Sequence, residues 1–462
     1  MDSILEKCAV FGVYGKGLDV AKLTYFGLYA LQHRGQESSG ISVADGKTIR
    51  THKATGLVAQ VYTEEGLESM RGYIAIGHNR YATSGGIFQQ HTQPVTTPKN
   101  RLVLAHNGNL PQTKKLEAFL EAKKIKTEGM NDSELVHKAI EYYLLHGLSL
   151  KDGIKKAFPL LTGAFCLLLM TKDELVAIRD EYGIRPLSLG RLNGGYIISS
   201  ETCAMDTVNA TYIRDIAPGE MVVINSRGIK SFQLAKPKQK LDIFEFVYFS
   251  RPDSMLLGKR VYVVRENLGR ELAKEFSKKA DAVIPVPESA IPAAIGYSKQ
   301  SGIPLELGLI KNRYIGRTFI MPDQKLRESG VRMKLNPIKE VISGKNLIVI
   351  DDSIVRGTTS KQLVAMLRRA GAKKVYVLSS CPPVKYPDFY GIATPKQKDL
   401  IAARMSVSKI QKFIGADGLY YLSYKGMIAA TGLSERLFCT SCYTGIYPID
   451  IGDRAKTIKK VQ

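Results

Sequence analysis

Two adjacent aspartates follow a short apolar run and precede a loop of small residues. Asp351 and Asp352 come directly after residues 347–350, and Gly357 and Thr358 lead into a segment with helical periodicity. Ligands of parallel sheets bind beyond the carboxyl ends of the strands, and a Gly/Thr loop at a helix N-terminus offers N–H groups to a phosphate. A strand end capped by acids would account for one aspartate but not for two. The motif therefore predicts a site for a phosphorylated ribose, with or without Mg²⁺.

A second strand end and a basic segment accompany this motif. Residues 282–287 are apolar and are followed by Glu288 and Ser289, although by itself this pattern also fits a plain strand–helix connection. Residues 311–337 contain seven cations and little periodicity. We expect this segment to be a cationic lid over a polyanion rather than a solvated loop.

Cys8 is a candidate nucleophile near the start of the chain, at the head of an apolar strand. A buried cysteine usually serves packing. At a mature N-terminus, however, its α-amino group, with a pKa of about 7.7–8, can act as the general base. That chemistry requires the removal of residues 1–7.

Three further segments could serve such a nucleophile. Residues 106–109 (His-Asn-Gly-Asn) are predicted to form a tight turn between strands, where Asn107 and Gly108 could form an oxyanion hole or simply a hairpin. Arg80 could bind a carboxylate through two hydrogen bonds. Asp132 could bind an ammonium group or cap a helix.

Two kinds of architecture should position these residues. Residues 1–235 are rich in apolar runs bounded by glycine and Asn-Gly turns, which predict a strand-rich domain, with helices at 20–31 and 133–145. Residues 236–240 (KPKQK) read as a linker. Beyond it, strands at 282–287, 346–350 and 374–378 alternate with helices at 292–299 and 360–370, a rhythm that predicts a parallel sheet.

Composition narrows the possible classes of protein. The 462 residues are 44% hydrophobic and 24% charged, and the longest apolar runs fall far short of the roughly 18 residues of a membrane span. Six cysteines and an N-terminus without a secretion signal fit the cytoplasm. The net charge of +23 is spread along the chain without zinc-finger spacing, so a lysine-rich surface is favoured over nucleic-acid binding.

Taken in order, these segments resemble the glutamine phosphoribosylpyrophosphate amidotransferases (amidophosphoribosyltransferases), which catalyse the first committed step of purine biosynthesis. The resemblance runs almost from Cys8 to Pro448 and covers residues 31–38, 77–83, 105–109, 179–186, 244–254, 308–320, 347–360 and 438–448. It implies an N-terminal-nucleophile hydrolase αββα sandwich followed by a type I phosphoribosyltransferase α/β domain. The implied divisions are a propeptide (1–7), a glutaminase domain (8–235), a linker (236–245), a phosphoribosyltransferase domain (246–447) and a basic tail (448–462).

The resemblance also implies roles for individual residues. Cys8 would attack the glutamine amide, and Asn107 and Gly108 would stabilise the oxyanion. The residues implied to position glutamine are Arg34, Arg80, Tyr81, Thr83 and Asp132. Ammonia would then pass through an internal tunnel to phosphoribosyl pyrophosphate (PRPP). The residues implied to hold PRPP are Asp351, Asp352, Ser353, Arg356, Gly357, Thr358, Thr359, Arg317 and Lys334, with Mg²⁺ held through Ser289, Asp351 and Asp352.

The chain departs from the iron–sulfur branch of the family. Two cysteine positions of that branch are Asp242 and Asp388 here, while Cys439 and Cys442 remain, so a four-thiolate [4Fe–4S] site cannot be built from these positions. Three alternatives stay open, in this order: no metal, an Asp₂Cys₂ zinc site, or a cluster with a carboxylate ligand. Ala9 and Glu288 also replace a glycine and an aspartate that are common in the family.

The resemblance favours one function over two others. The alternatives are a salvage phosphoribosyltransferase with an inactive glutaminase domain and a basic nucleic-acid-binding protein. The presence of Cys8, Arg80, Asn107, Gly108 and Asp132 argues against a degenerate first domain. The family further implies a homotetramer inhibited by purine nucleotides, with no nucleic-acid or membrane partner.

Overall fold

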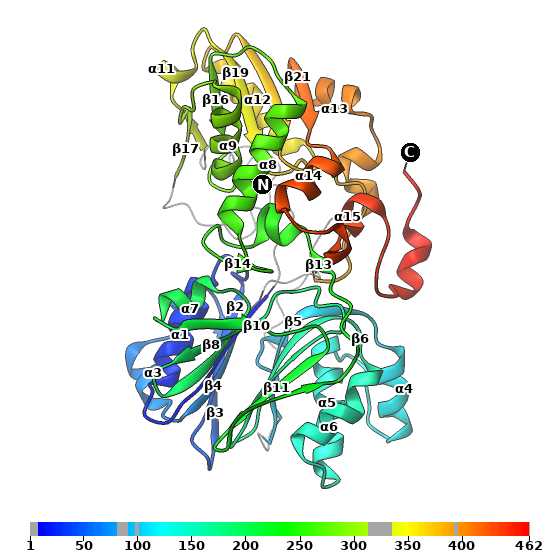
Figure 1. Ribbon diagram of the computed structural model, residues 1–462. Coiled ribbons are helices and arrows are strands. Elements are labelled where there is room, and N and C mark those ends of the chain that lie inside the picture. The colour runs from blue at the N-terminus through cyan, green and yellow to red at the C-terminus, as the bar shows by residue number, and fades with distance from the viewer. Residues whose placement is uncertain (1–7, 81–90, 98–100, 313–334, 392–395, 462) are drawn as a thin grey trace.

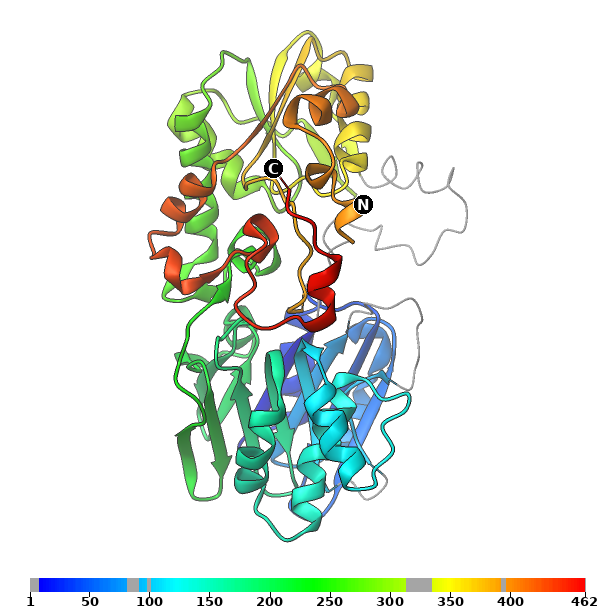
Figure 2. The same ribbon diagram turned by 90° about the vertical axis from the view of Figure 1, so that its right-hand side faces the viewer.

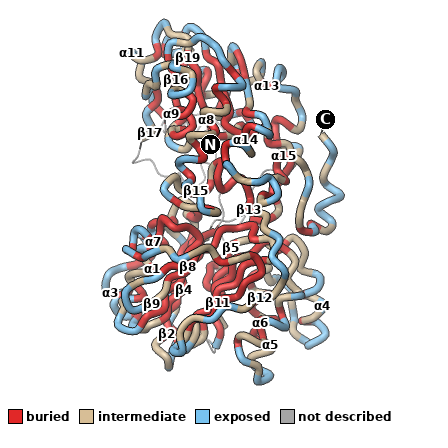
Figure 3. The backbone as a smooth tube through the Cα atoms, viewed as in Figure 1, coloured by how far each residue is buried: buried red, intermediate tan, exposed pale blue. Residues whose placement is uncertain are grey.

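The chain is described here by a computed structural model, which covers residues 8–80, 91–97, 101–312, 335–391 and 396–461. Two units are stacked along one axis (Figure 1). We call residues 8–240 the first half and residues 241–461 the second half. Buried backbone is concentrated in the sheets of both halves (Figure 3).

The first half is a sandwich of two antiparallel sheets. The seven-stranded sheet has the order β10-β8-β9-β1-β4-β2-β3, and the five-stranded sheet has the order β12-β11-β7-β6-β5. Val10, Ile76, Ala105 and Leu168 belong to the buried apolar layer between them. The strands are β1 (Ala9–Tyr14), β2 (Ser38–Ala44), β3 (Ile49–Thr55), β4 (Ile74–Arg80), β5 (Val103–Gln112), β6 (Thr162–Met170), β7 (Leu175–Arg179), β8 (Ser188–Leu192), β9 (Gly195–Ser199), β10 (Thr211–Asp215), β11 (Glu220–Asn225) and β12 (Gly228–Gln233).

Helices cover the outer face of each sheet, because each strand alternates side chains between the inner layer and a helical layer. The helices α1 (Val20–Ala30), α2 (Val58–Val61), α3 (Glu64–Ser69) and α7 (Cys203–Thr207) pack on the seven-stranded sheet. The helices α4 (Lys114–Ala122), α5 (Asp132–Leu145) and α6 (Leu150–Ala157) pack on the five-stranded sheet. The result is a four-layer αββα sandwich.

The second half is built on a parallel sheet of order β16-β19-β20-β21. Its strands are β16 (Ala282–Pro285), β19 (Asn346–Asp351), β20 (Lys374–Ser379) and β21 (Gly418–Tyr421), and its longer helices are α8 (Val261–Glu275), α9 (Ile291–Ser301), α12 (Thr358–Arg369), α13 (Val407–Ile414) and α14 (Tyr424–Thr431). Helices α8 and α9 approach each other closely at Gly269 of α8 and Gly296 of α9. A Cβ on Gly269 would lie 1.7 Å from the carbonyl oxygen of Ala293, so no larger residue fits there.

Smaller elements complete the second half. They are β14 (Met255–Leu256), β15 (Lys259–Arg260), β17 (Leu309–Lys311), β18 (Leu335–Pro337), α11 (Lys339–Ile342), α15 (Ser441–Thr444) and a π-helical turn at Glu245–Phe249. Strand β13 (Leu241–Asp242) pairs in parallel with β22 (Phe438–Cys439) beside the first half. The segment after β20 and the C-terminal segment both descend to the first half (gold and red in Figure 2).

Most of the predicted elements are present at nearly the predicted bounds, including α1, α5, α9 and α12. The predicted tight turn at residues 106–109 was wrong: these residues lie inside β5 and pair with β6, with Asn107 opposite Cys166. Asn and Gly are typical of turns, and their presence in a paired strand misled the prediction. Among the described residues, no helix is both long enough and apolar enough to cross a membrane.

Candidate active sites

One serine connects Asn107 to the strand that begins directly after Cys8. Cys8 is buried at the head of β1, two residues before Val10. The Oγ of Ser200 accepts hydrogen bonds from the backbone N–H of Val10 (2.9 Å) and from Nδ2 of Asn107 (3.3 Å). Ser200 therefore fixes the start of β1 and the predicted oxyanion-hole amide with respect to each other.

Gly108 lies in a tightly packed stretch of β5. A Cβ at this position would come 2.1 Å from the carbonyl oxygen of Ala164 on β6, so only glycine fits. Its neighbour Asn107 is completely buried. A backbone N–H and a side-chain amide held this firmly are the kind of preorganised donors that stabilise an oxyanion.

Arg80 and Asp132 lie on elements that adjoin these residues. Arg80 ends β4, and because Ala9 pairs with Asn79, the register places Arg80 beside Cys8. Asp132 begins α5, and its carboxylate accepts a hydrogen bond from the N–H of Leu110 on β5 (3.1 Å). Asn131, not Asp132, caps this helix. Two other predicted glutamine-binding residues, Tyr81 and Thr83, lie outside the described residues.

The side chain of Arg34 has a different environment from the one implied by the resemblance. It is 1% exposed and donates to both carboxylate oxygens of Glu245 at 2.7 Å, and to Glu201 at 3.1 Å. A glutamine carboxylate would have to displace one of these acids. The structure thus places Arg34 in an ion network between the two halves and does not bring it to the glutamine site.

The two carboxyl groups of this network, those of Glu201 and Glu245, stay ionised although they are buried. Burial opposes the ionisation of Glu201, but the charges of His33 and Arg34 hold its pKa below the ordinary value. Burial likewise opposes the ionisation of Glu245, and the charges of Arg185 and Arg34 lower the pKa of its carboxyl overall. Both carboxylates are therefore ionised partners of buried cations.

The second predicted site lies at the carboxyl end of β19. Asp351 and Asp352 are 9% and 6% exposed. The hydroxyls of Ser289 and Ser353 both donate to the Asp352 carboxylate, the latter at 2.6 Å. Burial raises the pKa of Asp351, and the charge of Asp352 raises it further. Burial also raises the pKa of Asp352.

The loop after these acids has the conformation expected for a phosphate cradle. Gly357 adopts φ +78° and directly precedes α12, whose first residue is Thr358. The turn thereby presents backbone N–H groups and hydroxyls at the positive end of a 12-residue helix. Arg356 is exposed at the edge of this turn. The two lid residues, Arg317 and Lys334, fall outside the described part of the chain.

The two proposed metal sites differ in their donor atoms. Asp351, Asp352 and Ser289 offer only oxygen donors, and the two carboxyl groups are buried in adjacent positions, so this set fits Mg²⁺. In the described residues, no group of three or more His, Cys, Asp or Glu side chains is arranged to hold a metal.

Asp242, Asp388, Cys439 and Cys442, the second proposed set, are buried near one another. Burial, followed by the charge of Asp242, raises the pKa of both thiols in the metal-free protein. Burial and the charge of Asp388 likewise raise the pKa of Asp242. The three alternatives for this set stay predictions.

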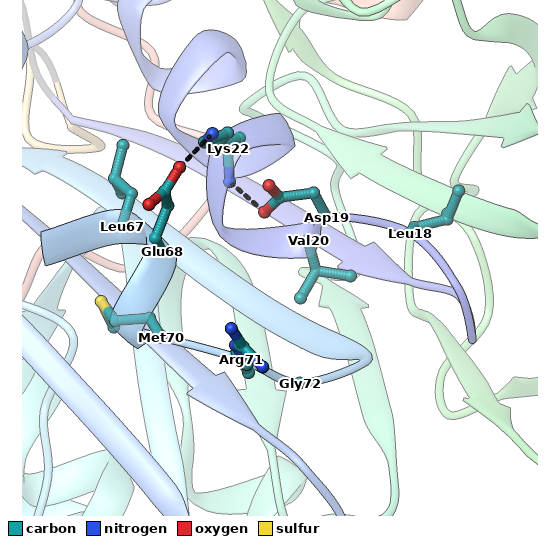
Figure 4. Close-up of a pocket in the computed structure, with 9 residues that line it drawn as sticks. All are labelled: Leu18, Asp19, Val20, Lys22, Leu67, Glu68, Met70, Arg71 and Gly72. Carbon is teal, nitrogen blue, oxygen red and sulfur yellow. Dashed lines mark hydrogen bonds and ion pairs between the residues drawn. The ribbon is translucent and has the colours of Figure 1, made fainter. Parts of the chain in front are cut away.

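A separate hollow of about 430 Å³ lies between the start of α1 and residues 67–72 (Figure 4). Three of its charged residues already have partners among themselves: Lys22 contacts Glu68 at 3.1 Å, and Asp19 accepts the N–H of Lys22. None of the predicted site residues lines this hollow. We assign it no function.

Sequence reasoning missed several residues that the structure places beside Asn107 or at the junction of the two halves. They are Ser200, Glu201, Glu245 and Arg185, together with the segment at Phe389 described below. The one available signal was charge within apolar surroundings, such as Glu245 between Phe244 and Phe246. A charged residue in such a context is rarely buried unless it is paired.

Known proteins resemble this chain over nearly its whole length. A family described as "Glutamine amidotransferase domain" matches residues 78–207. Amidophosphoribosyltransferase of Synechococcus elongatus is 49% identical, with 98% of this chain and 94% of that protein covered. The protein of the same name from Methanocaldococcus jannaschii is 42% identical, with 96% and 98% covered. The chain belongs to the amidophosphoribosyltransferase family.

A solved structure of the family confirms the fold class. Glutamine PRPP amidotransferase from Bacillus subtilis, in complex with ADP and GMP, superposes with a TM-score of 0.90 at 45% identity, covering 96% of this chain and 98% of that one. The predictions of an N-terminal-nucleophile sandwich, a phosphoribosyltransferase fold and a pentosyl-transferring amidotransferase are thereby confirmed. The relatives support neither an inactive glutaminase domain nor a nucleic-acid-binding protein.

Proposed function

We propose that this amidophosphoribosyltransferase releases ammonia from glutamine at Cys8 and transfers it to PRPP at the Asp351–Asp352 site. The products are 5-phosphoribosylamine, glutamate and diphosphate. The observation that carries the proposal is the presence of two sites in one chain. In the sandwich, Ser200 joins Asn107 to the strand that follows Cys8, and in the parallel sheet paired carboxylates precede a Gly/Thr loop at a helix N-terminus.

In the first half, the Cys8 thiolate attacks the side-chain amide of glutamine after residues 1–7 have been removed. The α-amino group accepts the thiol proton and returns it to the leaving ammonia, so that a thioester forms and water then hydrolyses it to glutamate. Asn107 and Gly108 donate to the oxyanion. Arg80 binds the α-carboxylate, and the partly exposed carboxylate of Asp132 binds the α-ammonium.

In the second half, the loop from Ser353 to Thr359 holds the 5′-phosphate and the two aspartates accept hydrogen bonds from the ribose hydroxyls. Mg²⁺ held by Ser289, Asp351 and Asp352 would neutralise charge on the leaving diphosphate. Arg317 and Lys334 would cover that diphosphate and exclude water. Ammonia attacks C1′ while the bond to the diphosphate breaks.

Transfer of ammonia between the sites needs a water-poor route, because NH₃ is protonated in water and then cannot attack. Aromatic side chains at the junction support such a route. The rings of Phe244 and Phe249 lie 5.5 Å apart, and the Arg185 guanidinium lies 5.8 Å from the Phe249 ring centre.

Regulation and assembly are proposed by analogy. The Bacillus subtilis relative was solved with ADP and GMP, and we propose that purine nucleotides inhibit this enzyme as well. We further propose a cytoplasmic homotetramer acting in purine biosynthesis, without nucleic-acid or membrane partners.

The decisive experiment is Cys8→Ala. We expect glutamine-dependent formation of phosphoribosylamine to disappear while synthesis from ammonium chloride at alkaline pH persists, because the second site is untouched. Cys166→Ala, a substitution in β6 of the same sandwich, is the matched control and should retain both activities. Persistent glutamine use by Cys8→Ala would refute the proposal.

A further inference from the structure

A segment of the second half lies directly against the oxyanion-hole strand of the first half. Nδ2 of Asn109, one residue after Gly108, donates to the carbonyl oxygen of Phe389 at 2.7 Å, across 280 residues of sequence. Gly391 is buried at the same contact. A Cβ built on Gly391 would lie 3.3 Å from Cα of Gly108 and 3.5 Å from Cδ of Arg185.

Hydrogen bonds hold this segment in place within the second half. Within it, the carboxylate of Asp388 accepts the N–H of Tyr390 at 2.8 Å. The hydroxyl of Tyr390 donates to the carbonyl oxygen of Ile449 and accepts the N–H of the same residue at 3.0 Å. The hydroxyl of Tyr447 donates to the carbonyl oxygen of Pro387 at 2.7 Å.

An apolar cluster joins the anchored segment to the first half. Tyr390, Cys439 and Ile449 of the second half are buried together with Ala164 and Ile184 of the first half. Ala164 pairs with Asn109 across β6 and β5, and its carbonyl oxygen is the atom that confines Gly108 from the other side. Gly108 is therefore held between β6 and Gly391.

We infer that residues 388–391 are a positioning element for the glutaminase reaction: they hold Gly108, and with it the oxyanion hole, in catalytic geometry. This inference rests on the proposed role of Asn107 and Gly108. Removing a whole oxyanion donor costs about 10²–10³ in kcat, and displacement of reacting groups by about 1 Å costs about 10²-fold. A shift of a few tenths of an ångström should therefore lower kcat roughly 10-fold.

Two variants test the contact, one in each half of the chain. Gly391→Ala places a methyl group against Gly108, and Asn109→Asp replaces the amide donor with a carboxylate that repels the Phe389 carbonyl. We expect either change to lower kcat of glutamine hydrolysis about 10-fold while KM for glutamine changes less than about 2-fold. Alkylation of Cys8 by iodoacetamide, which needs no oxyanion hole, and ammonia-dependent synthesis should remain at wild-type rates.

A control variant and the pattern of outcomes distinguish this inference from the proposed function on which it rests. Gly391 has a φ of +125°. Gly415→Ala changes a second glycine of positive φ, +75°, where a Cβ would meet no atom within 4 Å, and this variant should leave kcat of glutamine hydrolysis unchanged. Wild-type kcat in both contact variants, or parallel loss of the glutaminase and ammonia-dependent activities, would overturn the positioning role. Glutamine hydrolysis by Cys8→Ala would instead overturn the proposed function itself.

Discussion

The guanidinium of Arg34 and the carboxylate of Glu245 form a bidentate ion pair across the junction of the two halves, with N–O distances of 2.7 Å. Both side chains are at most 1% exposed. Removing one partner of a buried pair leaves the other charge uncompensated, which typically costs about 3–5 kcal/mol.

We therefore predict that Arg34→Met lowers the free energy of unfolding by about 3–5 kcal/mol, as measured by urea denaturation. The double variant Arg34→Met/Glu245→Met should lose less free energy of unfolding than the sum of the losses of the two single variants, because fewer buried charges are left without a partner. A stable Arg34→Met enzyme with a greatly increased KM for glutamine would instead restore the role implied by the resemblance.

Ser200→Ala should impair glutamine hydrolysis without affecting the second site. The change leaves the N–H of Val10 and the amide of Asn107 without their shared acceptor, a loss of about 1–3 kcal/mol in a buried setting. Steady-state assays should show kcat for glutamine reduced about 10-fold and unchanged ammonia-dependent synthesis. Ser226→Ala, on an exposed turn, is the control. Equal loss of both activities would contradict the prediction.

Asp351→Asn should abolish synthesis with either nitrogen source, because both routes end at the same ribose site. We expect a loss of at least about 100-fold, in line with the removal of a principal electrostatic group. Cys8 should still react with iodoacetamide in this variant. Asp173→Asn, a change at an exposed acid of the first half, should have no effect. Wild-type activity in Asp351→Asn would place the sugar elsewhere.

Stability should fall as the solution is acidified below about pH 6.5. Burial lowers the pKa of His78 to about 3, so the folded protein does not bind a proton that the unfolded chain binds below its ordinary pKa of 6.5. Between these values each pH unit costs up to about 1.4 kcal/mol. His78→Gln should flatten the dependence of the melting temperature on pH between 6.5 and 5. His146→Gln, at an exposed position, should leave the slope unchanged.

Active enzyme should have lost residues 1–7. The proposed base is the α-amino group of Cys8, which exists only after cleavage. Intact-mass spectrometry of the active preparation should therefore show a chain that begins at Cys8. A full-length chain that hydrolyses glutamine at the wild-type rate would rule out this base.

The local elements were predictable from sequence because their signals are short-range. The apolar run before Asp351, the small residues of the loop and the periodicity of α12 all lie within residues 347–367. The αββα arrangement came instead from the resemblance, since no spacing in the sequence reports how two sheets stack. For Cys8, the sequence left both a nucleophile and a packing residue open, and the resemblance favoured the nucleophile.

The contacts between segments far apart in the sequence were not predictable in this way. Ser200 and Asn107 are 93 residues apart, and Asn109 and Phe389 are 280 apart, and each looks like an ordinary polar or aromatic residue in its own segment. Arg34 is a similar case, because the carboxylate of Glu245 that binds its guanidinium lies 211 residues away. The glutamine-binding role implied for Arg34 stays a prediction.

The end of the chain contacts the first half: the side chains of Asp450 and Asp453 bind those of Gln112 and Lys114. During synthesis the sandwich leaves the ribosome long before these aspartates do. The contacts of these aspartates with Gln112 of β5 and Lys114 of α4 can thus form only after residues 450–453 have been synthesised. This part of the junction between the two halves therefore forms late in synthesis.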